Sequence, residues 1–270
     1  MNKDNTSISK SRCYPFGNDL EILLPLKKVC MFHPIATPGL PTLVTHYQPI
    51  VNCVTSEIIG FEGLTRATTE HCLLGPDVFI PAILEADLGG EMDLHVLDRV
   101  KRDINALGTR FADTIFFVNV FRSSLGDPRL RENLCHQTPT TQGARVCLEI
   151  SEQGEALTDF QTLCDLRRHG TLMAFDDYDP RYFSDAAVSQ IAPEFLKIRW
   201  DVYLGPDHAE ICQTISTLDR HNTQIIVEGI ETAAQCEAVR RAGFQLVQGF
   251  HYHPPMPFES LCALSDTAIR

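Results

Sequence analysis

The 270-residue sequence lacks the features of several protein classes. It has no run of about 18 apolar residues, so no membrane-spanning helix is predicted, and residues 1–10 are polar and lack the apolar core of a secretion signal. Basic residues are fewer than acidic ones, 23 against 35, which gives a net charge of −12. We therefore expect direct binding neither to DNA nor to an anionic membrane.

The ten cysteines include no Cys-x-x-Cys pair, which argues against a zinc ribbon. Their irregular spacing in a chain of this length also argues against a small disulfide scaffold. Most of them lie inside apolar runs, as buried reduced thiols do. We therefore expect a cytoplasmic protein.

Residues 1–40 differ in composition from the rest of the chain. They are rich in Ser, Asn and Pro, with one apolar patch at Leu20–Leu26 and prolines at positions 34 and 38. We expect an N-terminal arm that is partly ordered at most, or a short docking helix, followed by one domain over residues 41–270.

Short apolar segments alternate with helical patterns over about 220 residues. The predicted strands are Val44–Val51, Ile58–Leu64, Ile115–Val120, Val146–Ile150, Leu172–Phe175, Phe195–Ile198, Gln224–Val227 and Leu246–Gln248. The predicted helices are Asp77–Asp87, Met92–Leu107, Glu155–His169, Asp207–Arg220 and Ala233–Ala242. Eight such units predict an α/β fold, a (β/α)8 barrel, with a doubly wound sheet as the alternative. About six residues join the first two strands, too few for a parallel crossover, so these strands should form an antiparallel hairpin.

Oxygen-bearing side chains recur at the ends of the predicted strands. They are Glu62, Asn119, Glu149, Asp176, Asp177 and Glu228. In a barrel the strand ends meet at one rim, and carboxylates that lie so close together repel one another unless a cation lies among them. The pattern therefore predicts a site for one or two Mg²⁺ or Mn²⁺ ions, of the kind that activates water against a phosphodiester.

Three further residues are candidates for the same site. Lys197, at the end of the sixth predicted strand, is expected to hold the water or to neutralise phosphate charge, with a salt bridge at the barrel end as the alternative. Glu231, three residues after Glu228, is expected to support the metal ligands from outside. Arg66 lies just beyond Glu62, where a phosphate contact is expected.

The same residues resemble the ordered motifs of the EAL-domain family. The matching segments are Tyr47–Ile50, Gly60–Arg66, Val118-Asn119, Leu148–Glu152, Asp176–Tyr178, Leu196–Ile198, Glu228–Glu231, Gln248–Phe250 and Pro255–Pro257. The Glu-Ala-Leu that names the family corresponds here to Glu62-Gly63-Leu64. The resemblance covers roughly residues 43–257.

The resemblance implies a barrel with an antiparallel first strand that hydrolyses the bacterial second messenger cyclic di-GMP to linear pGpG with Mg²⁺ or Mn²⁺. It implies that the six strand-end residues are metal ligands. It also implies that Lys197 orients or activates the water together with Glu228. It makes Glu152 a loop anchor and implies a homodimer. Nucleotide contacts would come from Gln48, Leu64, Arg66, Gln248 and Pro255.

Two segments depart from the family pattern. The usual Asp-Asp-Phe-Gly-Thr-Gly is Asp176-Asp-Tyr-Asp-Pro-Arg181, which loses both glycines and gains a proline. The usual Lys-Ile-Asp is Lys197-Ile-Arg199, which puts a cation near the predicted ligands and should weaken the binding of an ion. A second hypothesis therefore stands beside the enzyme: a catalytically weak or inactive EAL-like receptor for cyclic di-GMP, or a regulator that binds a protein partner.

Overall fold

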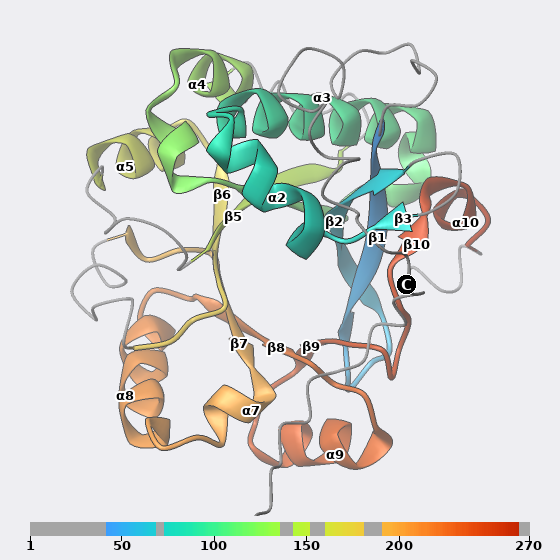
Figure 1. Ribbon diagram of the computed structural model, residues 1–270. Coiled ribbons are helices and arrows are strands. Elements are labelled where there is room, and N and C mark those ends of the chain that lie inside the picture. Colours follow the sequence, from blue (N-terminus) through green and yellow to red (C-terminus); the bar gives the residue numbers. More distant parts are fainter. Residues whose placement is uncertain (1–41, 69–72, 136–142, 152–159, 181–190, 265–270) are drawn as a thin grey trace, which may run out of the picture.

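The computed structural model describes residues 42–68, 73–135, 143–151, 160–180 and 191–264 (Figure 1). The predicted N-terminal arm, residues 1–40, and the predicted loop anchor Glu152 lie outside these ranges.

Within the described ranges, eight strands close into a barrel. They are β1 (Thr42–Asn52), β2 (Ile58–Thr68), β4 (Ile115–Val120), β5 (Arg145–Ser151), β6 (Leu172–Asp176), β7 (Phe195–Arg199), β8 (Gln224–Glu228) and β9 (Leu246–Gln248). β1 pairs antiparallel with both β2 and β9, and the other neighbours are parallel. The predicted barrel with a reversed first strand is therefore confirmed, and a doubly wound sheet is excluded because β1 closes the ring.

The hairpin between β1 and β2 follows from its turn residues. The Asn52 side-chain oxygen accepts hydrogen bonds from the backbone of Val54 and Thr55, at 2.9 and 3.1 Å, and Ser56 takes a left-handed φ of 65°. Further along β2, Gly60 permits close contact with β4, because a Cβ there would lie 2.5 Å from the carbonyl oxygen of Ile115. The turn and the glycine together fix the position of β2 beside both neighbours.

Helices surround the strands on the outside (Figure 1). They are α2 (Pro76–Glu85), α3 (Gly89–Leu107), α4 (Pro128–Cys135), α5 (Phe160–Arg168), α7 (Trp200–Tyr203), α8 (His208–Asp219), α9 (Ala233–Arg241) and α10 (Phe258–Cys262). Short 3-10 helices at Gly108–Phe111 and Arg122–Gly126 and the two-residue strands β3 (Leu73–Leu74) and β10 (Met256–Pro257) complete the described elements. No helix in the described part of the chain is both long and apolar enough to cross a membrane.

Alternation along the strands places the polar residues inside one rim of the barrel. Phe117, Cys147, Ala174, Phe195 and Ile226, from five adjacent strands, belong to one buried apolar cluster. Two positions later, on the same face of each strand, stands a polar residue. These residues are Asn119, Glu149, Asp176, Lys197 and Glu228. The apolar layer thus forms the floor on which a polar layer rests at the carboxyl ends of the strands.

Candidate active site

Lys197 lies at the centre of the polar layer and is completely buried. Its Nζ lies 2.7 Å from Glu149 Oε1, 2.8 Å from Glu228 Oε1, 3.0 Å from Asp176 Oδ1 and 3.1 Å from Glu62 Oε2. One ammonium group therefore faces carboxylates from four other strands. The predicted convergence of these strand-end residues is observed, and its centre is a lysine nitrogen.

Three side-chain amides hold Glu62 in this arrangement. Asn119 Nδ2 donates to Glu62 Oε1 at 2.9 Å and to Glu149 Oε2 at 3.1 Å. Gln248 Nε2 donates to Glu62 Oε2 at 2.6 Å and to Gln48 Oε1 at 3.1 Å. Gln48 in turn donates to the carbonyl oxygen of residue 253 at 3.1 Å. The two glutamines predicted as nucleotide contacts are therefore also structural links from β1 and β9 to Glu62.

The negative charge of the cluster exceeds what Lys197 neutralises. Burial, followed by repulsion from Glu62, raises the pKa of Glu149 well above its usual value. Burial, opposed by Lys197 but reinforced by Asp176, raises the pKa of Glu228 to about 8. Burial alone would lower the pKa of Lys197, but the carboxylates outweigh it and raise that pKa well above its usual range. At neutral pH the lysine is charged, while at least one neighbouring carboxyl group favours its protonated form.

The carboxylate and amide oxygens of the cluster are of the chemical type that binds a hard divalent cation. Glu149 Oε1 and Asp176 Oδ1 are buried and pair with the ammonium of Lys197 but accept no further hydrogen bond from the described residues. Gln248 Oε1 is buried and accepts no hydrogen bond from a described residue, which is unusual for a buried oxygen. Lys197 has three N–H donors for four carboxylates, so it cannot satisfy them all. Within the described ranges, however, no three Asp, Glu, His or Cys side chains are arranged to hold a metal ion. The lysine nitrogen takes the position where the carboxylates converge, so an ion would compete with it for the same oxygens.

The altered segment after β6 is held by Tyr178, which is completely buried. Its backbone N–H donates to the carbonyl oxygen of Lys197 at 2.9 Å, and its hydroxyl lies 2.9 Å from the hydroxyl of Thr214 on α8. Asp177, just before it, has a left-handed φ of 49°, and burial together with Asp176 raises its pKa. The tyrosine found in place of the family phenylalanine thus adds a hydrogen bond that helps to fix this turn.

Arg199 lies beyond the cluster at the end of β7. Its Nε and Nη2 lie 3.0 and 2.5 Å from the two carboxylate oxygens of Asp201, and 55% of its side chain is exposed. The side chain therefore pairs with the following turn and forms no ion pair with the four carboxylates around Lys197. Part of the added charge is therefore paired with Asp201, and the expected weakening of ion binding stays a prediction.

The remaining predicted residues that the structure describes make no hydrogen bond or ion pair with the carboxylate cluster. Arg66 is partly buried and donates to the carbonyl oxygen of Thr65 at 2.8 Å. Leu64 and Pro255 are also partly buried. Glu231 is exposed, and its carboxylate makes no hydrogen bond or ion pair with a described residue. The geometry therefore gives no contact between Glu231 and the ligand cluster.

Asp93 is a buried carboxylate that sequence reasoning missed. It is 2% exposed on α3 and accepts a hydrogen bond of 2.8 Å from the backbone N–H of Phe121, two residues after Asn119. Burial, partly offset by its hydrogen bonds, raises its pKa to about 7. The helical spacing of the sequence indicates this burial, because Asp93 lies on the same helix face as the buried residues Leu97 and Val100.

The family follows from a comparison with known domains. The EAL domain model matches residues 39–255, most of the chain. The chain belongs to the EAL-domain family. The match includes the eight barrel strands and all the cluster residues described above.

Two relatives of this EAL domain are named as a cyclic di-GMP phosphodiesterase and a probable one. It is 29% identical over 232 residues to the cyclic di-GMP phosphodiesterase NbdA of Pseudomonas aeruginosa, a match that covers 81% of this chain and 30% of NbdA. It is 28% identical to the probable cyclic di-GMP phosphodiesterase PdeD of Escherichia coli, covering 78% of this chain and 41% of PdeD. The chain thus spans less than half the length of either relative.

A solved structure, the PaMucR phosphodiesterase in complex with c-di-GMP, matches this EAL domain with a TM-score of 0.68. The sequence identity is 26%, and the match covers 81% of this chain and 99% of that one. The fold is therefore that of EAL domains.

Proposed function

We propose that this EAL domain hydrolyses cyclic di-GMP to linear pGpG with Mg²⁺ or Mn²⁺ held by the carboxylates around Lys197. One observation carries the proposal: buried oxygens from several strand ends converge with more negative charge than the lysine offsets. Such a set suits a divalent ion and a phosphate ester. The names of the relatives supply the substrate class.

The proposed ligands are Glu62, Asn119, Glu149, Asp176, Asp177 and Glu228. A bound divalent ion supplies charge neutralisation and lowers the pKa of a water molecule. In the reaction the water oxygen forms a bond to phosphorus, and the P–O3′ bond breaks. The water gives up a proton, and the leaving 3′ oxygen takes one. This stoichiometry gives a linear dinucleotide with a 5′ phosphate.

Lys197 and Glu228 have different proposed roles. The raised pKa of Lys197 keeps its ammonium charged, so it acts as a hydrogen-bond donor that positions the attacking water or a phosphate oxygen. Glu228 is the proposed proton acceptor, because its carboxylate lies beside the ammonium that positions the water. The 2.8 Å between Lys197 Nζ and Glu228 Oε1 lets the two groups act on one water molecule.

A cyclic di-GMP receptor is the second candidate. The observation that favours it is the lysine nitrogen at the convergence point, which partly neutralises the carboxylates without an ion. In that case the nucleotide binds in the absence of metal and is released unchanged. A regulatory protein partner would then bind the nucleotide-bound form in preference to the free form.

A hydrolysis assay separates the two candidates. The chain is incubated with labelled cyclic di-GMP and Mn²⁺, Mg²⁺ or EDTA, and the products are resolved by chromatography. We expect pGpG with either ion and none with EDTA. Glu62→Gln should lower turnover by about 10²-fold or more, whereas Glu57→Gln, an exposed glutamate in the β1–β2 hairpin, should not.

The opposite results decide against the enzyme. If wild-type protein forms no pGpG with either ion but calorimetry shows cyclic di-GMP binding in EDTA, the receptor function replaces hydrolysis. If neither product nor binding is found, both nucleotide functions are wrong.

A further inference from the structure

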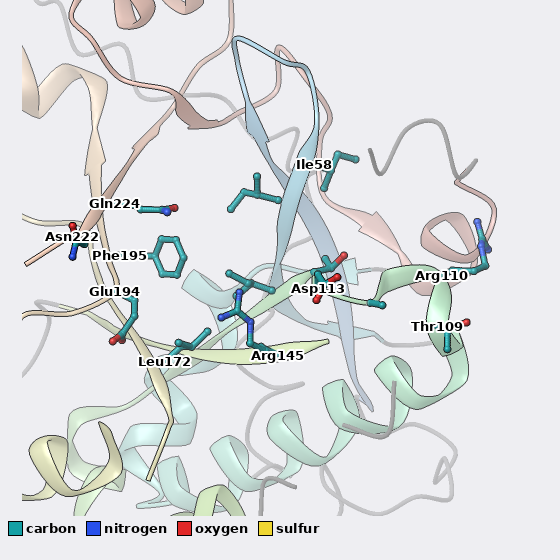
Figure 2. A pocket seen from close by; sticks show the side chains of 14 residues that line it. Ile58, Thr109, Arg110, Asp113, Arg145, Leu172, Glu194, Phe195, Asn222 and Gln224 are labelled. Atoms are coloured by element: carbon teal, nitrogen blue, oxygen red, sulfur yellow. The ribbon is translucent and has the colours of Figure 1, made fainter. Parts of the chain in front are cut away.

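A cavity of about 760 Å³ opens at the rim of the barrel opposite the carboxylate cluster (Figure 2). Its wall includes the first residues of β2, β4, β5, β6, β7 and β8, whereas the cluster lies toward the other ends of these strands. The volume lies within the range of small-molecule sites. The proposed hydrolysis uses none of its lining residues.

The floor of the cavity is apolar and well fixed. Ile59, Ile115, Leu172 and Phe195 line it and also belong to, or pack against, the buried cluster inside the barrel. The ring of Phe195 packs edge-on against the ring of Phe117, with centroids 5.0 Å apart. A ligand in the cavity would therefore rest on side chains that the barrel core already holds in place.

The charged side chains of the cavity wall differ in whether they have hydrogen-bond or ion-pair partners among the described residues. Glu194 pairs with Arg167 at 3.0 Å and points away from the cavity centre, and Arg110 donates to two backbone carbonyls near the end of α10. Arg145, at the start of β5, makes no side-chain hydrogen bond or ion pair with any residue that the structure describes. Figure 2 shows its guanidinium directed into the space beside Phe195. A guanidinium next to an aromatic floor provides an anion contact and an apolar contact together.

We propose that this cavity binds a small organic anion, with its acidic group on Arg145 and an aromatic or aliphatic body over Phe195 and Leu172. The site is separate from the carboxylate cluster, so the anion and cyclic di-GMP should bind without competition. Asp113, on the exposed turn before β4, also lacks a described side-chain partner and makes a cationic ligand the alternative to be excluded.

The experiment uses three dyes of different charge on the intact chain. The anionic probe is 8-anilinonaphthalene-1-sulfonate, the neutral probe is N-phenyl-1-naphthylamine, and the cationic probe is auramine O. Fluorescence titration should show saturable anion binding to one site, which Arg145→Gln weakens by about tenfold or more. Arg102→Gln, which removes an exposed arginine from α3 outside the cavity, should leave the affinity unchanged, and so should added cyclic di-GMP.

A steric variant provides a second arm. Ala112 is an exposed residue of the cavity wall. Ala112→Trp should fill part of the cavity and reduce the binding of the anionic and the neutral dye alike. The proposal is overturned if the anionic dye binds wild-type protein and Arg145→Gln equally, if cyclic di-GMP displaces it, or if the cationic dye binds more tightly than the anionic one.

Discussion

Replacing Lys197 with methionine tests how the carboxylate cluster is held together. Methionine keeps the apolar stem but removes the ammonium that lies 2.7–3.1 Å from four carboxylates. Removal of one partner from a buried ion pair costs about 3–5 kcal/mol in the free energy of unfolding. We expect a loss of about this size in EDTA at pH 8, measured by urea unfolding.

The loss should shrink as the pH falls. Lys197 has a raised folded-state pKa, so its own contribution to stability is complete below its unfolded-state pKa and is constant between pH 5 and 8. The pH dependence comes from Glu149 and Glu228, whose pKa values are raised already and rise further without the ammonium. Near pH 5 these groups bind protons in the folded variant and relieve the repulsion, so the loss is smaller there.

Manganese supplies the second part of this test. A divalent ion among the same oxygens replaces the missing charge, so Mn²⁺ should stabilise the Lys197→Met variant more than wild-type protein. Lys101→Met is the matched control, because Lys101 hydrogen-bonds Asn133 on the helical layer and its loss should cost only about 1 kcal/mol at either pH. A cost below about 1 kcal/mol for Lys197→Met at pH 8, or equal stabilisation by Mn²⁺, would refute the reasoning.

Three further substitutions test single contacts. Tyr178→Phe removes the hydroxyl contact with Thr214 and should lower the free energy of unfolding by about 1 kcal/mol; a loss below about 0.3 kcal/mol in urea would contradict this. Asp93→Ala leaves the Phe121 N–H without its acceptor and should lower the free energy of unfolding by about 1–3 kcal/mol and reduce the rate of pGpG formation. Asp93→Asn keeps an acceptor oxygen and should restore both stability and rate. Equal rates of pGpG formation for the two variants would argue against a role of Asp93 in positioning the segment after Asn119. Arg199→Gln should raise Mn²⁺ affinity in calorimetry by at most about tenfold, since its charge is exposed and already paired; a larger gain would mean that this cation limits the site.

The fold was predictable because its signals are local and repeated. The predicted strands Ile115–Val120 and Leu246–Gln248 have the bounds that the structure gives. The link of about six residues between the first two predicted strands is too short for a parallel crossover, so it requires the reversed first strand. Short elements such as α7 and α10 were missed because four or five residues carry too little periodicity. The described part of the predicted Glu155–His169 helix is Phe160–Arg168.

The site was predictable in its membership but not in its geometry. Strand-end positions identified Glu62, Glu149 and Asp176, because alternation puts them on the inner face. That Lys197 takes the centre depends on the reach of its side chain, which no sequence pattern records. The direction of Arg199 toward Asp201 likewise depends on the turn after β7.

Crystals grown with cyclic di-GMP and Mn²⁺ test the central claim most directly. Anomalous scattering recorded at the manganese edge locates the ion independently of the protein model. We predict a peak within coordination distance of Glu62, Glu149 and Asp176 oxygens, with the nucleotide phosphate beside it. An ordered nucleotide with no anomalous peak among these side chains would contradict metal-dependent hydrolysis at this site.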